Sequence, residues 1–185
     1  GLVSGESVFD NKTFVPLLPY LVEGEALNST LVSPIANTEF DDLYHSETWG
    51  KTPVTKYIFP VNQGEYSIHL HFADWHYEKA GDRVMDILLE NEIVLDDIDV
   101  INEVGKSAAV IKSFDMVVMD GNLELEIRNL SGFSQIAAIE ILPLGIPPLS
   151  IEKPDALNQV INFRSLGSVT IVDSPITLNA SSSSG

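Results

Sequence analysis

The middle of the chain is built from short segments in which apolar and polar positions alternate. In residues 65–72 every second position is apolar, so four large side chains share one face: Tyr66, Ile68, Leu70 and Phe72. Residues 122–128 repeat the pattern with Leu123, Leu125 and Ile127. A period of two is typical of a β-strand with one buried face. No window has a sustained helical period, so we expect an all-β fold.

The segments between these two strands predict the rest of the sheet structure. Further strands are expected at 55–61, twice within 83–100 around a turn at 90–92, and at 107–119 and 135–142. Asp120-Gly121 is a strong hairpin signal, and the polar residues 74–82 indicate a loop. Prolines break up residues 1–50, where we expect loops with one or two short strands. Strands with turns every ~8–12 residues are typical of antiparallel sandwiches and barrels.

Proline content divides the chain into a large domain and a short tail. Four prolines lie within residues 143–158, and such a run favours an extended linker, here 144–158. Residues 159–185 begin a second β-pattern that is too short to bury a core alone. We therefore expect a main domain at 1–143 and the truncated start of another at 159–185. Because the sequence begins with Gly1 rather than Met, we expect it to be a piece of a longer protein.

Composition removes several classes of function. Lys plus Arg is 10 and Asp plus Glu is 27, which gives a net charge of −17. A chain this acidic does not favour phosphate backbones or anionic lipid, so nucleic acid and membrane surfaces are set aside as partners. The absence of cysteine excludes thiol nucleophiles, disulfides and zinc–thiolate sites. An acidic, cysteine-free β-protein favours an extracellular or cell-surface setting, and we expect a bacterial one.

Five motifs, in order, resemble the malectin family of carbohydrate-binding β-sandwiches. They lie at residues 43–50 (LYHSETWG), 64–74, 81–87, 97–105 and 136–141. The resemblance implies a jelly-roll-like antiparallel sandwich with a non-catalytic, sugar-binding function. Two features depart from the family pattern: Thr48 stands where the family has Arg, and the family's opening Val-Asn-Ala-Gly-Gly strand is not visible. The tail at 159–185 resembles the start of a bacterial Ig-like repeat.

The loop Asp74-Trp75-His76-Tyr77 carries the chemistry that sugar binding requires. Aromatic faces stack on the apolar side of a sugar ring, while carboxylates and imidazoles hydrogen-bond to its hydroxyls. The resemblance implies sugar-stacking side chains at the positions of His76, Tyr77 and Tyr44. The alternative is that Trp75 or Tyr77 caps one end of the sandwich.

Two further segments contribute candidate ligand contacts. Glu47 lies between the aromatic residues Tyr44 and Trp49. One of these two rings is expected in the core, and Glu47 has the alternative role of bracing a loop. Phe133 lies in the loop at 131–134, where the family supplies a polar contact, and it offers another surface for stacking.

Metal binding and catalysis have weaker signals. His69 and His71 could chelate a metal with Asp74, but they could equally be an ordinary pair of strand histidines. Asp96, Asp97 and Asp99 could hold a structural calcium ion, although an EF-hand's glycine and closing glutamate are absent, and Asp99 could instead brace a turn. No nucleophile elbow, phosphate loop or zinc motif is present. We therefore expect no enzymatic activity and no cofactor.

The sequence thus predicts a non-catalytic module that binds oligo- or polysaccharide of the glucoside type. The binding residues would be Tyr44, Glu47, Asp74, Trp75, His76, Tyr77 and Phe133, and the parent chain's neighbouring domains would be its partners. The alternative is a protein- or peptide-binding adhesion module of the same fold, with Trp75 and Tyr77 as hot spots.

Overall fold

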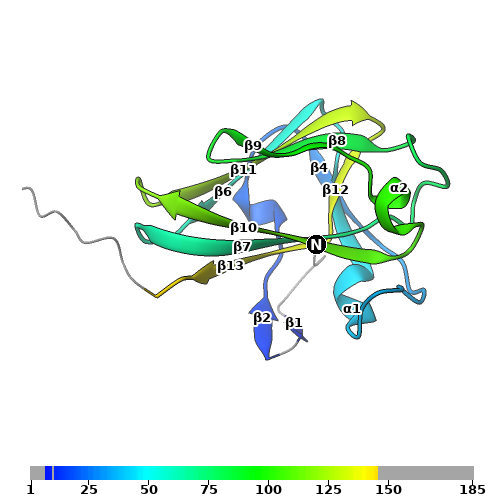
Figure 1. Ribbon diagram of the computed structural model, residues 1–185, viewed down its shortest axis with the longest axis horizontal. Helices are drawn as coiled ribbons and strands as arrows, with labels where there is room; N and C mark the ends of the chain where they lie inside the picture. Colours follow the sequence, from blue (N-terminus) through cyan, green and yellow to red (C-terminus); the bar gives the residue numbers. More distant parts are fainter. Residues whose placement is uncertain (1–6, 10, 146–185) are drawn as a thin grey trace, which may run out of the picture. The chain divides into compact units, whose positions relative to one another are not determined.

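Two antiparallel sheets face each other across the main hydrophobic core in the computed structural model, which describes residues 7–9 and 11–145 (Figure 1). The five-stranded sheet has the order β3-β6-β11-β8-β9. Its strands are β3 (Leu21–Glu23), β6 (Val54–Pro60), β11 (Asn122–Ser131), β8 (Val84–Leu89) and β9 (Glu92–Ile98). The expectation of an all-β antiparallel sandwich is confirmed.

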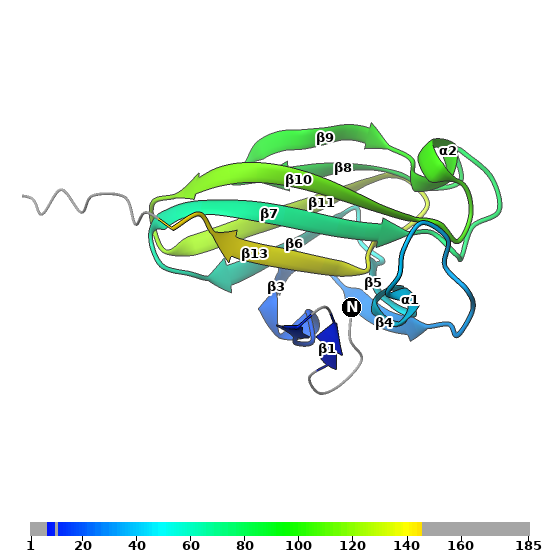
Figure 2. The same cartoon turned by 60° about the horizontal axis from the view of Figure 1, so that its bottom comes forward.

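The second sheet has three strands, which Figure 2 shows side by side in the order β10-β7-β13. They are β10 (Ala109–Val118), β7 (Gly64–Ala73) and β13 (Ala138–Pro143). A third sheet, β12-β5-β4, consists of β12 (Ser134–Ile136), β5 (Ser46–Gly50) and β4 (Ala26–Thr30). The smaller elements are the β1 (Ser7–Phe9) and β2 (Lys12–Phe14) hairpin, η1 (Leu18–Tyr20), α1 (Asp41–Tyr44) and α2 (Val100–Val104).

The alternating strands supply the core as expected. Ile68, Leu70 and Phe72 of β7 are fully buried, and they share one cluster with Leu123 and Leu125 of β11. Each fully buried side chain of this size contributes about 1.5–3 kcal/mol through removal from water. These two strands therefore hold the sheets together and fix the positions of the loops that follow them.

Turn signals predicted local geometry correctly but not strand pairing. The turn at 90–92 joins β8 to β9 as a hairpin, with positive φ at Glu90 (50°) and Asn91 (66°). Asp120-Gly121 also forms a turn, but it does not close a hairpin, because β10 pairs with β7 whereas β11 pairs with β6 and β8. The turn instead carries the chain from one sheet to the other, so the hairpin prediction was wrong.

The expected single strand at 135–142 is divided between two sheets. β12 pairs with β5, and β13 pairs with β7, after a break at Ala137. Residues 1–50 also hold more strand than expected, because β4 and β5 pair with each other along their full length. Such long-range pairing leaves little trace in local composition.

The predicted linker and Ig-like segment lie outside the described residues, apart from Leu144 and Gly145. Both assignments stay predictions. Within the part of the chain that the structure describes, no helix is long and apolar enough to cross a membrane.

Candidate functional site

A pocket of about 190 Å³ lies where the ends of several strands meet. It is lined by residues of β4, β5, the β7–β8 loop and the β11–β12 turn: Ser29, Glu47, Trp49, Trp75, His76, Arg83 and Phe133. Six of the seven, all except Ser29, carry an aromatic ring or a formal charge. The pocket also gathers four of the predicted site residues, Glu47, Trp75, His76 and Phe133, from segments far apart in the chain.

Asp74 shapes the loop that forms one wall of the pocket. One oxygen of its buried carboxylate, Oδ1, accepts hydrogen bonds from the backbone N–H groups of His76 (3.0 Å) and Tyr77 (3.1 Å). These bonds turn the chain immediately after β7. Further along, the N–H of Gly81 donates to Asp99 at 2.6 Å and ties the loop to the start of α2. The predicted loop therefore has a defined conformation.

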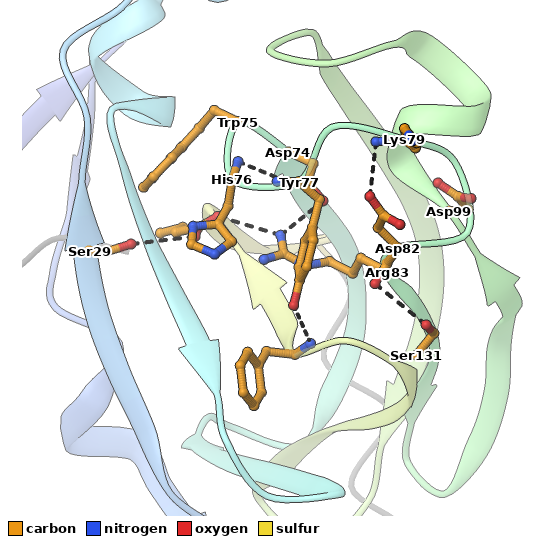
Figure 3. Close-up of polar contacts among 12 residues, drawn as sticks. Ser29, Asp74, Trp75, His76, Tyr77, Lys79, Asp82, Arg83, Asp99 and Ser131 are labelled. Carbon is orange, nitrogen blue, oxygen red and sulfur yellow. Dashed lines mark hydrogen bonds and ion pairs between the residues drawn. The ribbon is translucent and has the colours of Figure 1, made fainter.

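The aromatic residues of this loop have different roles (Figure 3). Trp75 lines the pocket, and its indole N–H donates to the backbone oxygen of Tyr44 at 3.2 Å. Tyr77 does not line the pocket: its ring lies over the guanidinium of Arg83, 4.8 Å away, and its hydroxyl accepts from the N–H of Phe133 at 3.2 Å. Tyr77 thus packs against Arg83 and the β11–β12 turn, whereas Trp75 forms part of a wall.

A buried group of charges forms the floor of the pocket, where Glu47 and Arg83 line it and Asp74 pairs with Arg83. Arg83 is 3% exposed, and its Nη1 lies 3.2 Å from Asp74 Oδ2 and 3.7 Å from Glu47 Oε2. Burial raises the pKa of Glu47 from 4.5 to about 7; Arg83 opposes this shift and the nearby charge of Asp74 adds to it. Two carboxylates therefore share one cation in a region from which water is largely excluded.

Trp49 and Phe133 form the opposite wall. Their ring centroids are 5.3 Å apart, and the Lys51 ammonium lies 5.7 Å from the Trp49 ring. Glu47 and Trp49 are two residues apart on β5, so both point to the pocket side of that strand. Thr48 points to the other side and donates to Asn28 at 2.7 Å, so the departure from the family's Arg lies outside the pocket.

Tyr44 does not occupy the surface position that was expected. It is 2% exposed, and its hydroxyl bonds to His71 Nδ1 at 2.9 Å. His71 Nε2 lies 3.0 Å from Glu140 Oε1, and the other carboxylate oxygen of Glu140, Oε2, pairs with Lys12 at 2.6 Å. Because a carboxylate only accepts, Nε2–H donates to Glu140, and Nδ1 accepts from Tyr44. Tyr44 thus supports the pocket wall from the interior rather than presenting its ring to a ligand.

The same contacts correct the metal hypotheses. Both nitrogens of His71 are used by Tyr44 and Glu140, and His69 Nδ1 bonds to Ser113 at 2.7 Å, while Asp74 faces Arg83. The three groups therefore do not form a shared metal site in this arrangement.

The aspartates that were predicted to hold calcium are also arranged differently from the expectation. Carboxylate oxygens of Asp86, Asp96 and Asp97 lie within 4.8 Å of one another. Asp99 is not part of this group: its two oxygens accept from Asn102 N (2.9 Å) and from Gly81 N. Asp99 caps α2, which agrees with the bracing alternative.

Three pocket-lining residues were absent from the predicted binding set: Ser29, Trp49 and Arg83. Trp49 could have been identified from its spacing to Glu47, which places both on one face of a strand. Arg83 lies inside a family motif, but its role depends on burial between two carboxylates, for which the sequence gives no signal. Ser29 reaches the pocket only because β4 pairs with β5, where its hydroxyl donates to Glu47 at 3.4 Å.

Comparison with known proteins agrees with this architecture. The malectin domain model matches residues 8–143. Human malectin is 26% identical over 105 residues, covering 56% of this chain and 36% of that protein. A probable leucine-rich repeat receptor-like serine/threonine-protein kinase of Arabidopsis thaliana is 26% identical over 133 residues, covering 62% of this chain and 13% of the kinase. The chain thus spans well under half of these relatives.

Solved structures show the same fold. The extracellular domain of ANXUR2 from Arabidopsis thaliana superposes with a TM-score of 0.64 at 18% identity, covering 75% of this chain and 44% of that one. A β-glucuronidase of Bacteroides uniformis gives 0.63 at 19% identity, covering 73% and 16%. The likeness to both concerns the fold alone. The family match spans nearly all of the described residues, so the chain belongs to the malectin domain family.

Proposed function

We propose that this domain binds carbohydrate without catalysis, as a module for oligo- or polysaccharide of the glucoside type. The observation that carries the proposal is the pocket itself, in which aromatic rings from separate segments surround a buried group of hydrogen-bonding charges. Its volume of about 190 Å³ is below the range of about 300–1,000 Å³ typical of pockets for drug-sized ligands. A single sugar ring suits a pocket of this size.

The two kinds of lining residue would act on different parts of the sugar. The rings of Trp49 and Trp75 would stack on its apolar C–H face. Glu47 and Arg83 would accept from and donate to its hydroxyl groups. Nothing in this mechanism requires a bond to break, and the paired carboxylates of the floor are held by Arg83 rather than placed on either side of a scissile bond.

The setting of the module follows from the relatives and the composition. Some relatives are named as receptor-like kinases, and one solved structure is named as an extracellular domain. We propose an extracellular or cell-surface location, in a parent chain whose neighbouring domains share the binding. Modest affinity at one pocket would then be raised by avidity. The bacterial origin stays a prediction.

A glycan array followed by titration of α- and β-glucosides tests the proposal. Wild type should bind a defined set of glycans, and Trp49→Ala should lower the affinity at least about tenfold through loss of stacking, which contributes about 0.5–1.5 kcal/mol beyond buried area. Phe40→Ala is the matched control, because Phe40 is an exposed aromatic residue that does not line the pocket. Binding that Trp49→Ala leaves unchanged would contradict the proposal. Silence across the array would favour the protein-binding module of the same fold.

A further inference from the structure

The floor of the pocket has an unbalanced charge. Glu47 and Asp74 are each 1% exposed, and among the described residues the cation that pairs with both is Arg83, which lines the pocket together with Glu47. Lys51 lies over the Trp49 ring, and it is not a lining residue. When both carboxylates are ionised, this buried group carries a net negative charge, and the chain as a whole carries −17.

The same three side chains hold polar atoms without hydrogen bonds. Glu47 Oε2, Asp74 Oδ2, and Nε and Nη1 of Arg83 are buried and make none, although Nη1 lies within ion-pair distance of both oxygens. A carboxylate oxygen can only accept, so a ligand group that satisfies it must donate a hydrogen. A hydroxyl group can donate to the carboxylates and accept from Arg83. An ammonium group donates and also balances the excess charge.

A uronic acid keeps its ring hydroxyls, but a carboxylate replaces the hydroxyl group at C6. Its carboxylate offers no hydrogen to Glu47 or Asp74, and it would add a third negative charge around one guanidinium. Arg83 has N–H groups that could donate to it, but three buried carboxylates would then surround one guanidinium, and two negative charges would have no cation. We propose that the pocket selects its ligand by charge: it takes a neutral or amino sugar and rejects uronic acids. This inference rests on the proposed carbohydrate-binding function and names its substrate class.

Matched pairs of ligands test the selection directly. The probes are the methyl glycosides of glucose, galactose and mannose, each titrated beside its uronic acid and its 2-amino counterpart at pH 8. For any ring that binds, we expect the uronic acid to bind at least about tenfold more weakly than the neutral sugar, because like charges oppose each other within a site. The amino sugar should bind at least as tightly as the neutral one. Titrations at 0.15 and 0.5 M salt separate repulsion within the pocket from repulsion by the acidic surface. Salt screens the surface charges much more than the buried ones.

Two variants locate the effect. Glu47→Gln leaves one carboxylate for one guanidinium. The ratio of the affinities for the neutral sugar and the uronic acid should therefore fall several-fold. Glu78→Gln is the control, because Glu78 is an exposed acid of the same loop that pairs with Lys106. A uronic acid that binds as tightly as its neutral partner would overturn the inference, and so would a gap that Glu47→Gln leaves intact. If none of the sugars binds, in any form, the proposed function itself fails.

Discussion

The indole of Trp75 is held by the backbone of Tyr44, whose carbonyl oxygen accepts the indole N–H at 3.2 Å. Tyr44 lies at the end of α1, and its own hydroxyl points the other way, to His71. One residue thus connects the pocket wall to a buried polar chain that ends at Glu140 and Lys12. The wall depends on the main chain of Tyr44, and the core depends on its side chain.

This division of roles predicts the effect of Tyr44→Phe. The change removes the hydroxyl and leaves His71 with an unsatisfied buried nitrogen, which should lower the free energy of unfolding by about 1–3 kcal/mol. The carbonyl that holds Trp75 is retained, so ligand affinity should change less than about twofold. Urea denaturation and calorimetric titration measure the two quantities. A large loss of affinity with unchanged stability would instead place the Tyr44 hydroxyl at the ligand.

Arg83 should be among the most sensitive positions in the domain. Arg83→Met leaves Glu47 and Asp74 buried without a cation, and breaking a buried charge network in this way costs about 3–5 kcal/mol. Adding Glu47→Gln removes one of the two unpaired charges, so the double variant should recover part of the lost stability. Denaturant unfolding of the single and double variants measures this coupling. A cost below about 1 kcal/mol for Arg83→Met would contradict the buried network.

Stability should depend on pH through Glu47. Its pKa is about 7 in the native state and 4.5 in the unfolded state, so the native state binds more protons between these values. The free energy of unfolding should therefore fall as the pH rises from about 4.5 to about 7, by up to about 3 kcal/mol, and level off above. Glu47→Gln should remove this slope, as measured by urea unfolding at several pH values.

His71 should act with the opposite sign. Burial lowers its pKa below 6.5, so the unfolded state binds more protons and stability is lost as the pH falls below 6.5. The two effects overlap, but only the contribution of Glu47 disappears in Glu47→Gln. An identical pH profile in wild type and Glu47→Gln would show that Glu47 is ionised normally.

The sequence was informative wherever local pattern decides structure. Alternation identified the buried faces of β7 and β11, and the residues at 90–92 identified the turn between two strands. It was uninformative where distant segments choose partners, as when the chain crosses between sheets at Asp120-Gly121. The helices α1 and α2 have 4 and 5 residues, which is too short for a helical period to appear.

The site shows the same limit. Asp74 and its aromatic neighbours form a contiguous motif, so the loop was found. Composition could not decide whether Tyr44 or Trp49 lines the pocket, because both residues are aromatic and they are only five residues apart. Strand register decides it: Trp49 pairs with Leu27 and Gln135 on the pocket side of β5, whereas Tyr44 ends a helix that packs inward.

Gly132 supports the pocket through its backbone. Its φ is +67°, and a Cβ there would lie 2.4 Å from the Asp82 oxygen and 2.9 Å from the Tyr77 hydroxyl. The turn therefore brings Phe133 close enough to donate to Tyr77. Any larger residue must both adopt a strained conformation and push Tyr77 away from Arg83.

Gly132→Ala should accordingly weaken both stability and binding. We expect a loss of about 1–3 kcal/mol from backbone strain, with a further loss from crowding, and several-fold weaker ligand binding because Phe133 and Tyr77 move. Gly121→Ala is the control: its φ is +87°, but the nearest atom to the added Cβ, the Val61 oxygen, lies at an ordinary contact distance of 3.4 Å. Denaturant unfolding gives the loss in free energy of unfolding for each variant. The difference between the two losses is the cost of the close contacts that the added Cβ makes at position 132. Equal losses, with affinity unchanged in Gly132→Ala, would show that the close approach of Gly132 to Tyr77 is not needed for the pocket.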